Sequence, residues 1–289
     1  MTNHIEDFIL HLESHDRSKH TIQAYRLDLE QFEKWFESVN DDEMQPHLIT
    51  PTDLREFKHC LIQDEQLRPA SVNRKLASIR AFMKWAVGEG LIDVAPRMPK
   101  GVEQVSSAPK ALDRREMKAL IRAVERHGSQ RDQAIILVLL NTGLRVQECS
   151  SLDLGDIEMS ERKGRIIVRS GKGNKRREVP LNVEARRALL AYMEARREDR
   201  DSALFLSQQG SRLGSRGIQG VVAKYGRLAG LEDLTPHALR HTFCTNLLRA
   251  GTDIVTVAKL AGHADISTTS IYTQPAEKDL QKAVEGLVE

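Results

Sequence analysis

Hydrophobic residues in the first hundred positions recur at intervals of three and four, the spacing that gives an α-helix one apolar face. Polar and charged residues fill the positions between them. The pattern predicts four amphipathic helices, whose apolar stripes run through residues 5–12, 22–39, 54–61 and 72–86. We therefore expect a helical N-terminal domain over residues 1–95.

Residues 93–111 lack this periodicity and contain Pro96, Pro99, Gly101 and Pro109. Such a segment is typical of a link between two domains. We place the linker at residues 96–111 and a second domain at residues 112–289. The length of 289 residues agrees with two domains, because one domain usually has about 150.

The second domain starts as a helical one and then changes its period. Asp113 and Glu116 have the spacing of a capping box, and the apolar run 134–140 predicts a buried central helix. Residues 165–169 and 176–179 are β-branched runs on either side of a glycine-containing loop, which predicts a β-hairpin. Further helices are expected over residues 183–197, 215–228, 236–250 and 254–262, with an amphipathic one after Pro275. The fold class is mainly α, with a mixed α+β second domain.

Composition narrows the class of protein. Hydrophobic residues make up 40% of the chain and charged residues 29%, which indicates a globular protein. The longest apolar run has seven residues, whereas roughly 20 are needed to span a bilayer, so we expect no membrane partner. The three cysteines form no CxxC pair and predict no disulfide framework. No signal peptide is recognisable, and we expect a cytoplasmic protein.

The net charge of +2 conceals an uneven distribution. Residues 1–67 carry −9, residues 68–110 carry +5 and the remainder carries +6. Basic residues on the polar face of the fourth predicted helix and in the run 162–177 suit a DNA phosphate backbone, although each group alone is equally compatible with a solvated surface. The candidate DNA contacts are Arg74, Lys75, Arg80 and Lys84 in the helix and Lys175 and Arg176 in the run.

His237 and Arg240 follow Pro236 in the first turn of a predicted helix and project from one face. An imidazole and a guanidinium beside the free N–H groups of that turn would form a phosphate site. His241 and Cys244 continue the face, so a zinc site is the competing interpretation. No nearby acidic residue supports a metal ligand, and we expect no metal or other cofactor.

A second group of candidate residues ends at a tyrosine. Taken singly, each has an ordinary interpretation: a tyrosine in the core, an arginine in a salt bridge, a lysine in a hairpin or a buried histidine. Taken together they supply a nucleophile and a cationic cage for a phosphodiester. The six candidate catalytic residues are Arg145, Lys172, His237, Arg240, His263 and Tyr272.

Five motifs give the chain its resemblance to the tyrosine recombinases, the phage-integrase and Xer-like family. In order, they are NTGLRVQE, GKGNKRREVPL, TPHALRHTF, LAGH and ISTTSIYTQ, and SKHTIQAYRLDLEQF near the N-terminus is similar to the family's first long helix. The resemblance implies an N-terminal four-helix, SAM-like core-binding domain and a C-terminal catalytic domain with a small β-sheet, which together clamp duplex DNA. Ala261 replaces the family's usual leucine, and we expect this position to face the core.

The resemblance also implies a reaction. Tyr272 would attack a DNA phosphorus, with His237 as the base that takes its proton, and the product would be a 3′-phosphotyrosyl intermediate. Because the ester retains the bond energy, a 5′ hydroxyl can reverse the step without metal or ATP.

The remaining candidates would assist this step. Arg145, Arg240 and His263 would donate hydrogen bonds to the non-bridging oxygens, where charge builds in the transition state. Lys172 would protonate the leaving 5′ oxygen, as the matching lysine does in the family.

The expected partners follow from the same resemblance. In the family the last helix docks on a neighbouring protomer, although here the stripe of Leu280, Val284 and Leu287 could equally pack within its own chain. We expect double-stranded DNA with inverted-repeat core sites, bound by a homotetramer or by paired recombinases. The expected activity is site-specific recombination through a Holliday junction, in integration or excision, cointegrate resolution or chromosome-dimer resolution. The alternatives are a topoisomerase-like nick-and-reseal enzyme and a catalytically idle DNA-binding protein.

Overall fold

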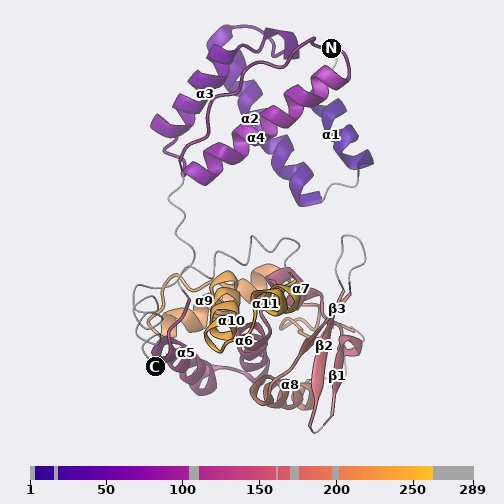
Figure 1. The fold of residues 1–289 in the computed structure, drawn as a ribbon, viewed down its shortest axis with the longest axis vertical. Helices are drawn as coiled ribbons and strands as arrows, with labels where there is room; N and C mark the ends of the chain where they lie inside the picture. Colours follow the sequence, from indigo (N-terminus) through magenta and orange to yellow (C-terminus); the bar gives the residue numbers. More distant parts are fainter. Residues whose placement is uncertain are drawn as a thin grey trace, which may run out of the picture. The chain divides into compact units, whose positions relative to one another are not determined.

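A computed structural model describes residues 4–15, 19–103, 111–160, 162–169, 176–196 and 202–262 (Figure 1). The chain divides into two compact units, Met1–Ser106 and Ser107–Glu289, and each unit has its own hydrophobic core. No helix in the described ranges is long and apolar enough to cross a membrane.

The N-terminal unit contains the four predicted helices, α1 (His4–Ser14), α2 (Lys19–Asn40), α3 (Pro51–Gln63) and α4 (Pro69–Gly88), and a short 3-10 helix, η1 (Pro46–Leu48). Thr50 and Asp53 form a capping box that begins α3, with Pro51 at the first helical position. The predicted apolar stripes face the core, which is rich in phenylalanine. Val39 is an exception: it lies at the end of α2 and is half exposed.

The first part of the predicted linker is bound to the N-terminal unit. Met98 and Val102 pack against its core. The side chain of Asn73 on α4 exchanges two hydrogen bonds, 2.9 and 2.7 Å long, with the backbone of Val102. The Lys58 ammonium donates to the carbonyl of Lys100. These contacts tie residues 98–102 to α3 and α4, so this stretch is not a free connection.

The C-terminal unit is built around α6 (Gln130–Thr142), which confirms the predicted buried central helix. The longer helices that pack against it are α5 (Arg114–His127), α8 (Val183–Ala195), α9 (Ser215–Leu228) and α10 (Pro236–Arg249). The predicted capping box of Asp113 and Glu116 begins α5. The short helix α11 (Ile254–Ala261) packs against α10 and the sheet, and Ala261 is fully buried, as expected from the sequence.

The small sheet has three antiparallel strands in the order β1 (Ile157–Met159), β2 (Gly164–Val168) and β3 (Arg177–Pro180). Ile166 pairs with both Ile157 and Val179, which fixes the register. The β2–β3 pair confirms the predicted hairpin. The sequence did not predict β1, the 3-10 helix η2 (Leu154–Asp156) or α7 (Val146–Ser151), because elements of three to six residues are too short to show a period.

Candidate active site

A tight turn between α6 and α7 carries Arg145. Gly143 ends α6 with φ of 63°, and a Cβ atom there would lie 2.4 Å from the ring of Phe243. Only glycine suits both the conformation and the close contact. Leu144 is fully buried, and the Arg145 side chain that follows it is 46% exposed. The turn therefore anchors the backbone in the core and leaves the guanidinium accessible.

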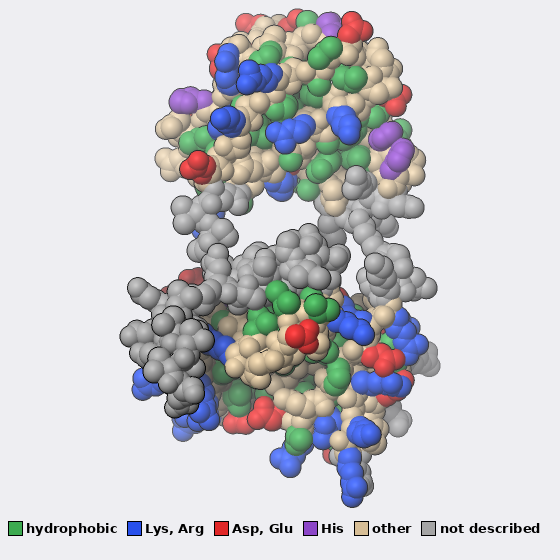
Figure 2. All heavy atoms as spheres, viewed as in Figure 1, with side chains coloured by type: hydrophobic (Ala, Val, Ile, Leu, Met, Phe, Trp, Pro, Cys, Tyr) green, Lys and Arg blue, Asp and Glu red, His purple; other side chains and the backbone are tan. Residues whose placement is uncertain are grey.

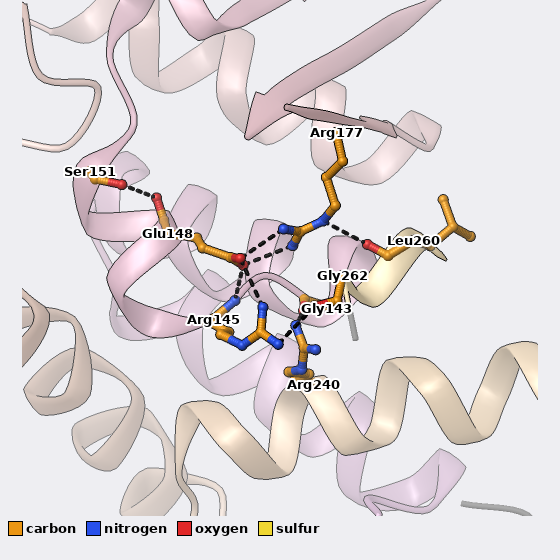
Figure 3. Close-up of polar contacts among 8 residues, drawn as sticks. All are labelled: Gly143, Arg145, Glu148, Ser151, Arg177, Arg240, Leu260 and Gly262. Carbon is orange, nitrogen blue, oxygen red and sulfur yellow. Dashed lines mark hydrogen bonds and ion pairs between the residues drawn. The ribbon is translucent and has the colours of Figure 1, made fainter. Parts of the chain in front are cut away.

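Glu148 on α7 holds Arg145 by both its main chain and its side chain (Figure 3). The Arg145 N–H donates to Oε2 at 2.7 Å, and Nη1 donates to Oε1 at 3.0 Å. The same carboxylate accepts two hydrogen bonds from Arg177 on β3, at 2.7 and 2.8 Å. Burial raises the pKa of Glu148, but the hydrogen bonds from Arg177 and Arg145 outweigh it, and the net pKa is lowered. The carboxylate is therefore ionised at neutral pH.

The first turn of α10 carries His237 and Arg240. Thr235 caps the helix by accepting from the Ala238 N–H, and Pro236 occupies the first position, as the sequence predicted. Arg240 is 3% exposed, and its Nη1 donates to the carbonyl of Gly143 at 2.6 Å. Arg240 thus supports the turn that presents Arg145.

His237 lies within reach of both arginine charges. Its ring is exposed on one side, yet the protein around it lowers its pKa, and the charges of Arg240 and Arg145 lower the pKa further. The imidazole is therefore neutral at physiological pH. A neutral imidazole beside two guanidinium groups can accept a proton while the arginines bind an anion.

The C-terminus of α11 closes the arrangement. Gly262 ends the helix with φ of 71°, and its carbonyl accepts from Arg145 Nη2 at 2.8 Å. The carbonyl of Leu260 accepts from Arg177 Nε at 3.1 Å. Both cations lie where the negative end of the helix dipole favours them. The next residue in the sequence is His263.

The structure brings together three of the six candidate catalytic residues, Arg145, His237 and Arg240, from two separate segments of the chain. The other three, Lys172, His263 and Tyr272, lie outside the described residues, as do the candidate DNA contact Lys175 and the predicted helix after Pro275.

The zinc alternative on α10 finds no support among the residues that the structure describes, where no group of three or more histidine, cysteine or acidic side chains could hold a metal ion. Burial raises the pKa of Cys244 to about 11, although the charge of Arg240 opposes the shift. In the absence of a metal ion, this thiol is therefore protonated at neutral pH.

The basic face of α4 is smaller than the sequence indicated. Arg74, Arg80 and Lys84 are exposed along one side of the helix. Lys75, however, was wrongly placed on this face: its side chain is 11% exposed and binds Asp28 at 3.3 Å. Lys75 lies on the buried side of α4, and the buried carboxylate of Asp28 on α2 compensates the charge of the lysine. Figure 2 shows basic side chains on the visible surface of the N-terminal unit.

Most described arginines of the basic run 162–177 are paired with acids. Arg165 binds Glu158 and Glu178 across the sheet, and Arg169 binds Asp156 at 2.7 Å. Arg176 is 59% exposed and lies 3.7 Å from Glu178. The run held two candidate DNA contacts, Lys175 and Arg176. Arg176 is the one that the structure describes, and its side chain is accessible.

Sequence reasoning missed two residues of the site, Glu148 and Arg177. A signal for Glu148 was present, because it follows Arg145 by three residues, as Glu116 follows Asp113 in a capping box. Arg177 carried no such signal. It was one of several bases in a run, and its partner lies 29 residues away.

Comparisons with known proteins show which family the chain resembles along most of its length. Residues 110–279 match the model of the phage integrase family, and residues 5–90 match that of the phage integrase N-terminal SAM-like domain. A tyrosine recombinase XerC from Thermodesulfovibrio yellowstonii is 35% identical over 97% of this chain and 95% of its own. A tyrosine recombinase XerA from Thermococcus kodakarensis is 34% identical over 97% and 94%.

Solved structures show the same fold. A crystal structure of XerA recombinase is 30% identical and covers 98% of this chain and 97% of its own, with a TM-score of 0.57. The post-cleavage complex of XerH site-specific recombinase with palindromic difH substrate is 23% identical and covers 93% and 80%, with a TM-score of 0.77.

Proposed function

The chain belongs to the phage integrase family and is a tyrosine-type site-specific recombinase, and on that premise we propose that it breaks and rejoins DNA through a 3′-phosphotyrosyl intermediate at the described site. The observation that carries the proposal is the convergence of Arg145 and Arg240 at one turn beside a neutral His237. Two guanidinium groups from separate elements can bind the non-bridging oxygens of a single phosphate. The relatives favour neither the topoisomerase nor the idle DNA-binding alternative.

In the proposed step, the Oη atom of Tyr272 attacks phosphorus while His237 takes the phenolic proton. A free tyrosine has a pKa near 10, so only about 0.1% is phenolate at neutral pH and the base is needed. The bond from phosphorus to the 5′ oxygen breaks, and Lys172 gives that oxygen a proton. Arg145, Arg240 and His263 stabilise the charge on the non-bridging oxygens.

Rejoining is the reverse of this step with a different 5′ hydroxyl. The hydroxyl attacks the phosphotyrosyl ester, and the tyrosine leaves and regains its proton. The bond energy is conserved, so we propose that neither a nucleotide nor a metal ion takes part.

The two units divide the work in this proposal. Residues 1–95 bind DNA as a core-binding domain, residues 96–111 connect, and residues 112–289 form the catalytic domain. Arg74, Arg80 and Lys84 on α4 would contact phosphates, together with Lys175 and Arg176. Lys75 would act indirectly, because its side chain is 11% exposed and lies against Asp28.

Assembly and location are likewise proposed. A duplex with inverted repeats presents two equivalent half-sites, and exchange between two duplexes requires four active sites. We propose a homotetramer, or a tetramer with a paired recombinase, joined through the predicted helix at residues 277–288. The protein would act on DNA in the cytoplasm.

The decisive experiment traps the covalent intermediate. A core site is first selected by binding from a random duplex library and then built into a duplex nicked near the cleavage position, so that the freed strand diffuses away. The wild type should give a band of reduced mobility on a denaturing gel, whereas Tyr272→Phe should give none and keep DNA affinity within a few fold. A covalent band from Tyr272→Phe, or none from the wild type on a bound site, would overturn the proposal.

A further inference from the structure

Arg177 makes three hydrogen bonds in the site, although the proposed mechanism has given it no role so far. Its Nη1 and Nη2 atoms bind both oxygens of Glu148, and its Nε binds the carbonyl of Leu260. The guanidinium also lies against Gly262, where a Cβ atom would come within 2.6 Å of Cζ. The side chain is 14% exposed. Because Nε, Nη1 and Nη2 all donate to groups of the protein itself, we assign Arg177 no contact with a DNA phosphate.

The charges explain why two arginines share one carboxylate. Glu148 with Arg145 alone would form a neutral pair, and a neutral pair attracts an anion weakly. Arg177 adds a second positive charge, so the three side chains together carry +1. Arg177 takes a bidentate geometry, while Arg145 keeps one hydrogen bond from its side chain to Glu148. The net positive charge is therefore left on Arg145, whose side chain is 46% exposed.

The same guanidinium joins three segments of the site. Arg177 is the first residue of β3. Its guanidinium binds Glu148 on α7 and the carbonyl of Leu260 in the last turn of α11. Along the sequence, β3 begins five residues after Lys172, and α11 ends two residues before His263. A planar fork with five N–H donors can satisfy these partners at once, whereas a lysine ammonium cannot.

From these contacts we infer that Arg177 is a positioning residue for the cleavage step: it compensates the charge of Glu148, which leaves the charge of Arg145 for the phosphate, and it holds the end of α11 beside Arg145. The inference rests on the proposed function. Groups that orient an active residue in this way typically change activity by about 10- to 100-fold when they are removed.

The test compares Arg177→Met with a matched control, Arg131→Met. Arg131 also donates two hydrogen bonds to a carboxylate, from Nε and Nη2 to Oδ1 of Asp132, and its Nη1 donates to the backbone carbonyl of Leu206. Both variants lose two hydrogen bonds to a carboxylate and one to a backbone carbonyl, so a purely structural role would affect both alike. The single-turnover rate of covalent complex formation is measured at saturating DNA, together with the melting temperature.

We expect Arg177→Met to cleave about 10- to 100-fold more slowly than the wild type, and Arg131→Met to cleave at the wild-type rate. Arg177→Lys should fall between the wild type and Arg177→Met, because it keeps the charge and loses the fork. If Arg177→Met does not fold, the cleavage rate of Arg177→Lys is compared with that of the wild type instead. Equal rates for the two methionine variants, or for Arg177→Lys and the wild type, would overturn the inference.

A double variant isolates the charge argument. In Arg177→Met the Glu148 carboxylate has Arg145 as its remaining arginine, so replacing it in Glu148→Gln should free the Arg145 charge and speed cleavage several-fold over Arg177→Met. A double variant no faster than Arg177→Met would contradict this role. Absence of covalent complex with the wild type would instead refute the proposed function, so the two failures are distinguishable.

Discussion

Two buried carboxylates organise the two units, and each holds one covered and one accessible base. In the N-terminal unit, Asp28 is 1% exposed and binds Lys75, which is 11% exposed, and Arg74, which is 48% exposed. In the C-terminal unit, Glu148 binds Arg177 and Arg145, which are 14% and 46% exposed. Each group of three side chains carries +1 and presents one cation to an anionic partner.

The two groups differ in the further contacts that their basic residues make. The bases around Asp28 come from one helix, α4, and Ser78 of the same helix donates to the carboxylate at 2.8 Å. This group joins two helices of a bundle, and in our proposal its accessible member, Arg74, contacts a phosphate. Around Glu148, both arginines go on to bind carbonyls of α11, and Arg240 supports the same turn. The same ionic motif thus joins two helices in one unit, and in the other it connects the segments that carry the proposed catalytic arginines.

The largest expected difference between the two groups is in the cleavage rate after the accessible arginine of each, Arg145 or Arg74, is replaced. Arg145→Ala should slow single-turnover cleavage at saturating DNA by about 10² to 10³, because it removes a preorganised transition-state donor. Arg240→Ala should have an effect of similar size. Arg74→Ala should leave the rate at saturating DNA unchanged. Normal cleavage by both cage variants would remove these arginines from the mechanism.

Removal of the buried carboxylate from the N-terminal group should cost stability. Asp28→Ala leaves Lys75 buried without its charged partner and should lower the free energy of unfolding of this unit by about 3 kcal/mol. The chain's two tryptophans, Trp35 and Trp85, both belong to this unit, so their fluorescence during denaturation of the full chain reports on it.

Glu6→Ala is the control for this measurement, because the Glu6–Arg26 pair is exposed and should contribute at most about 1 kcal/mol. Equal losses in the two variants would show that burial of Asp28 does not matter.

Arg74→Ala should reveal its role in the salt dependence of DNA binding. One phosphate contact fewer should reduce the slope of log affinity against log salt by about 1 and weaken binding uniformly across sequences. Fluorescence anisotropy with a labelled duplex at several salt concentrations measures both. An unchanged slope would mean that Asp28 holds Arg74 for structure alone.

The smallest expected effect is a change in the pKa of His237. Partial burial and the charges of Arg240 and Arg145 lower this pKa, so removing the charge in Arg145→Ala should raise it. The imidazole would then protonate at a higher pH than in the wild type. Titration of the His237 ring by NMR in the free protein measures the shift. Arg74→Ala serves as the reference and should leave the His237 pKa as it is in the wild type.

Local patterns in the sequence predicted the elements that carry the site. Three such patterns act within a few residues: the capping box at Asp113 and Glu116, the buried run of α6 and the proline that begins α10. The helices that contain them could therefore be predicted from the spacing of residues along the chain. The short helix α7 could not be predicted in this way. It has six residues, fewer than two turns, and its position depends on Glu148 and the glycine turn before it.

Patterns along the chain were sufficient to predict the four-helix N-terminal unit, the hairpin of β2 and β3, the buried central helix and the set of residue types suited to a phosphodiester. Which charged side chains contact one another depends on how these elements pack. Lys75 is buried because α2 brings Asp28 beneath it, and Arg145 reaches Gly262 across 117 residues of sequence. Helix and strand periods depend on neighbours along the chain, whereas ion pairs depend on distances in space that no local pattern encodes.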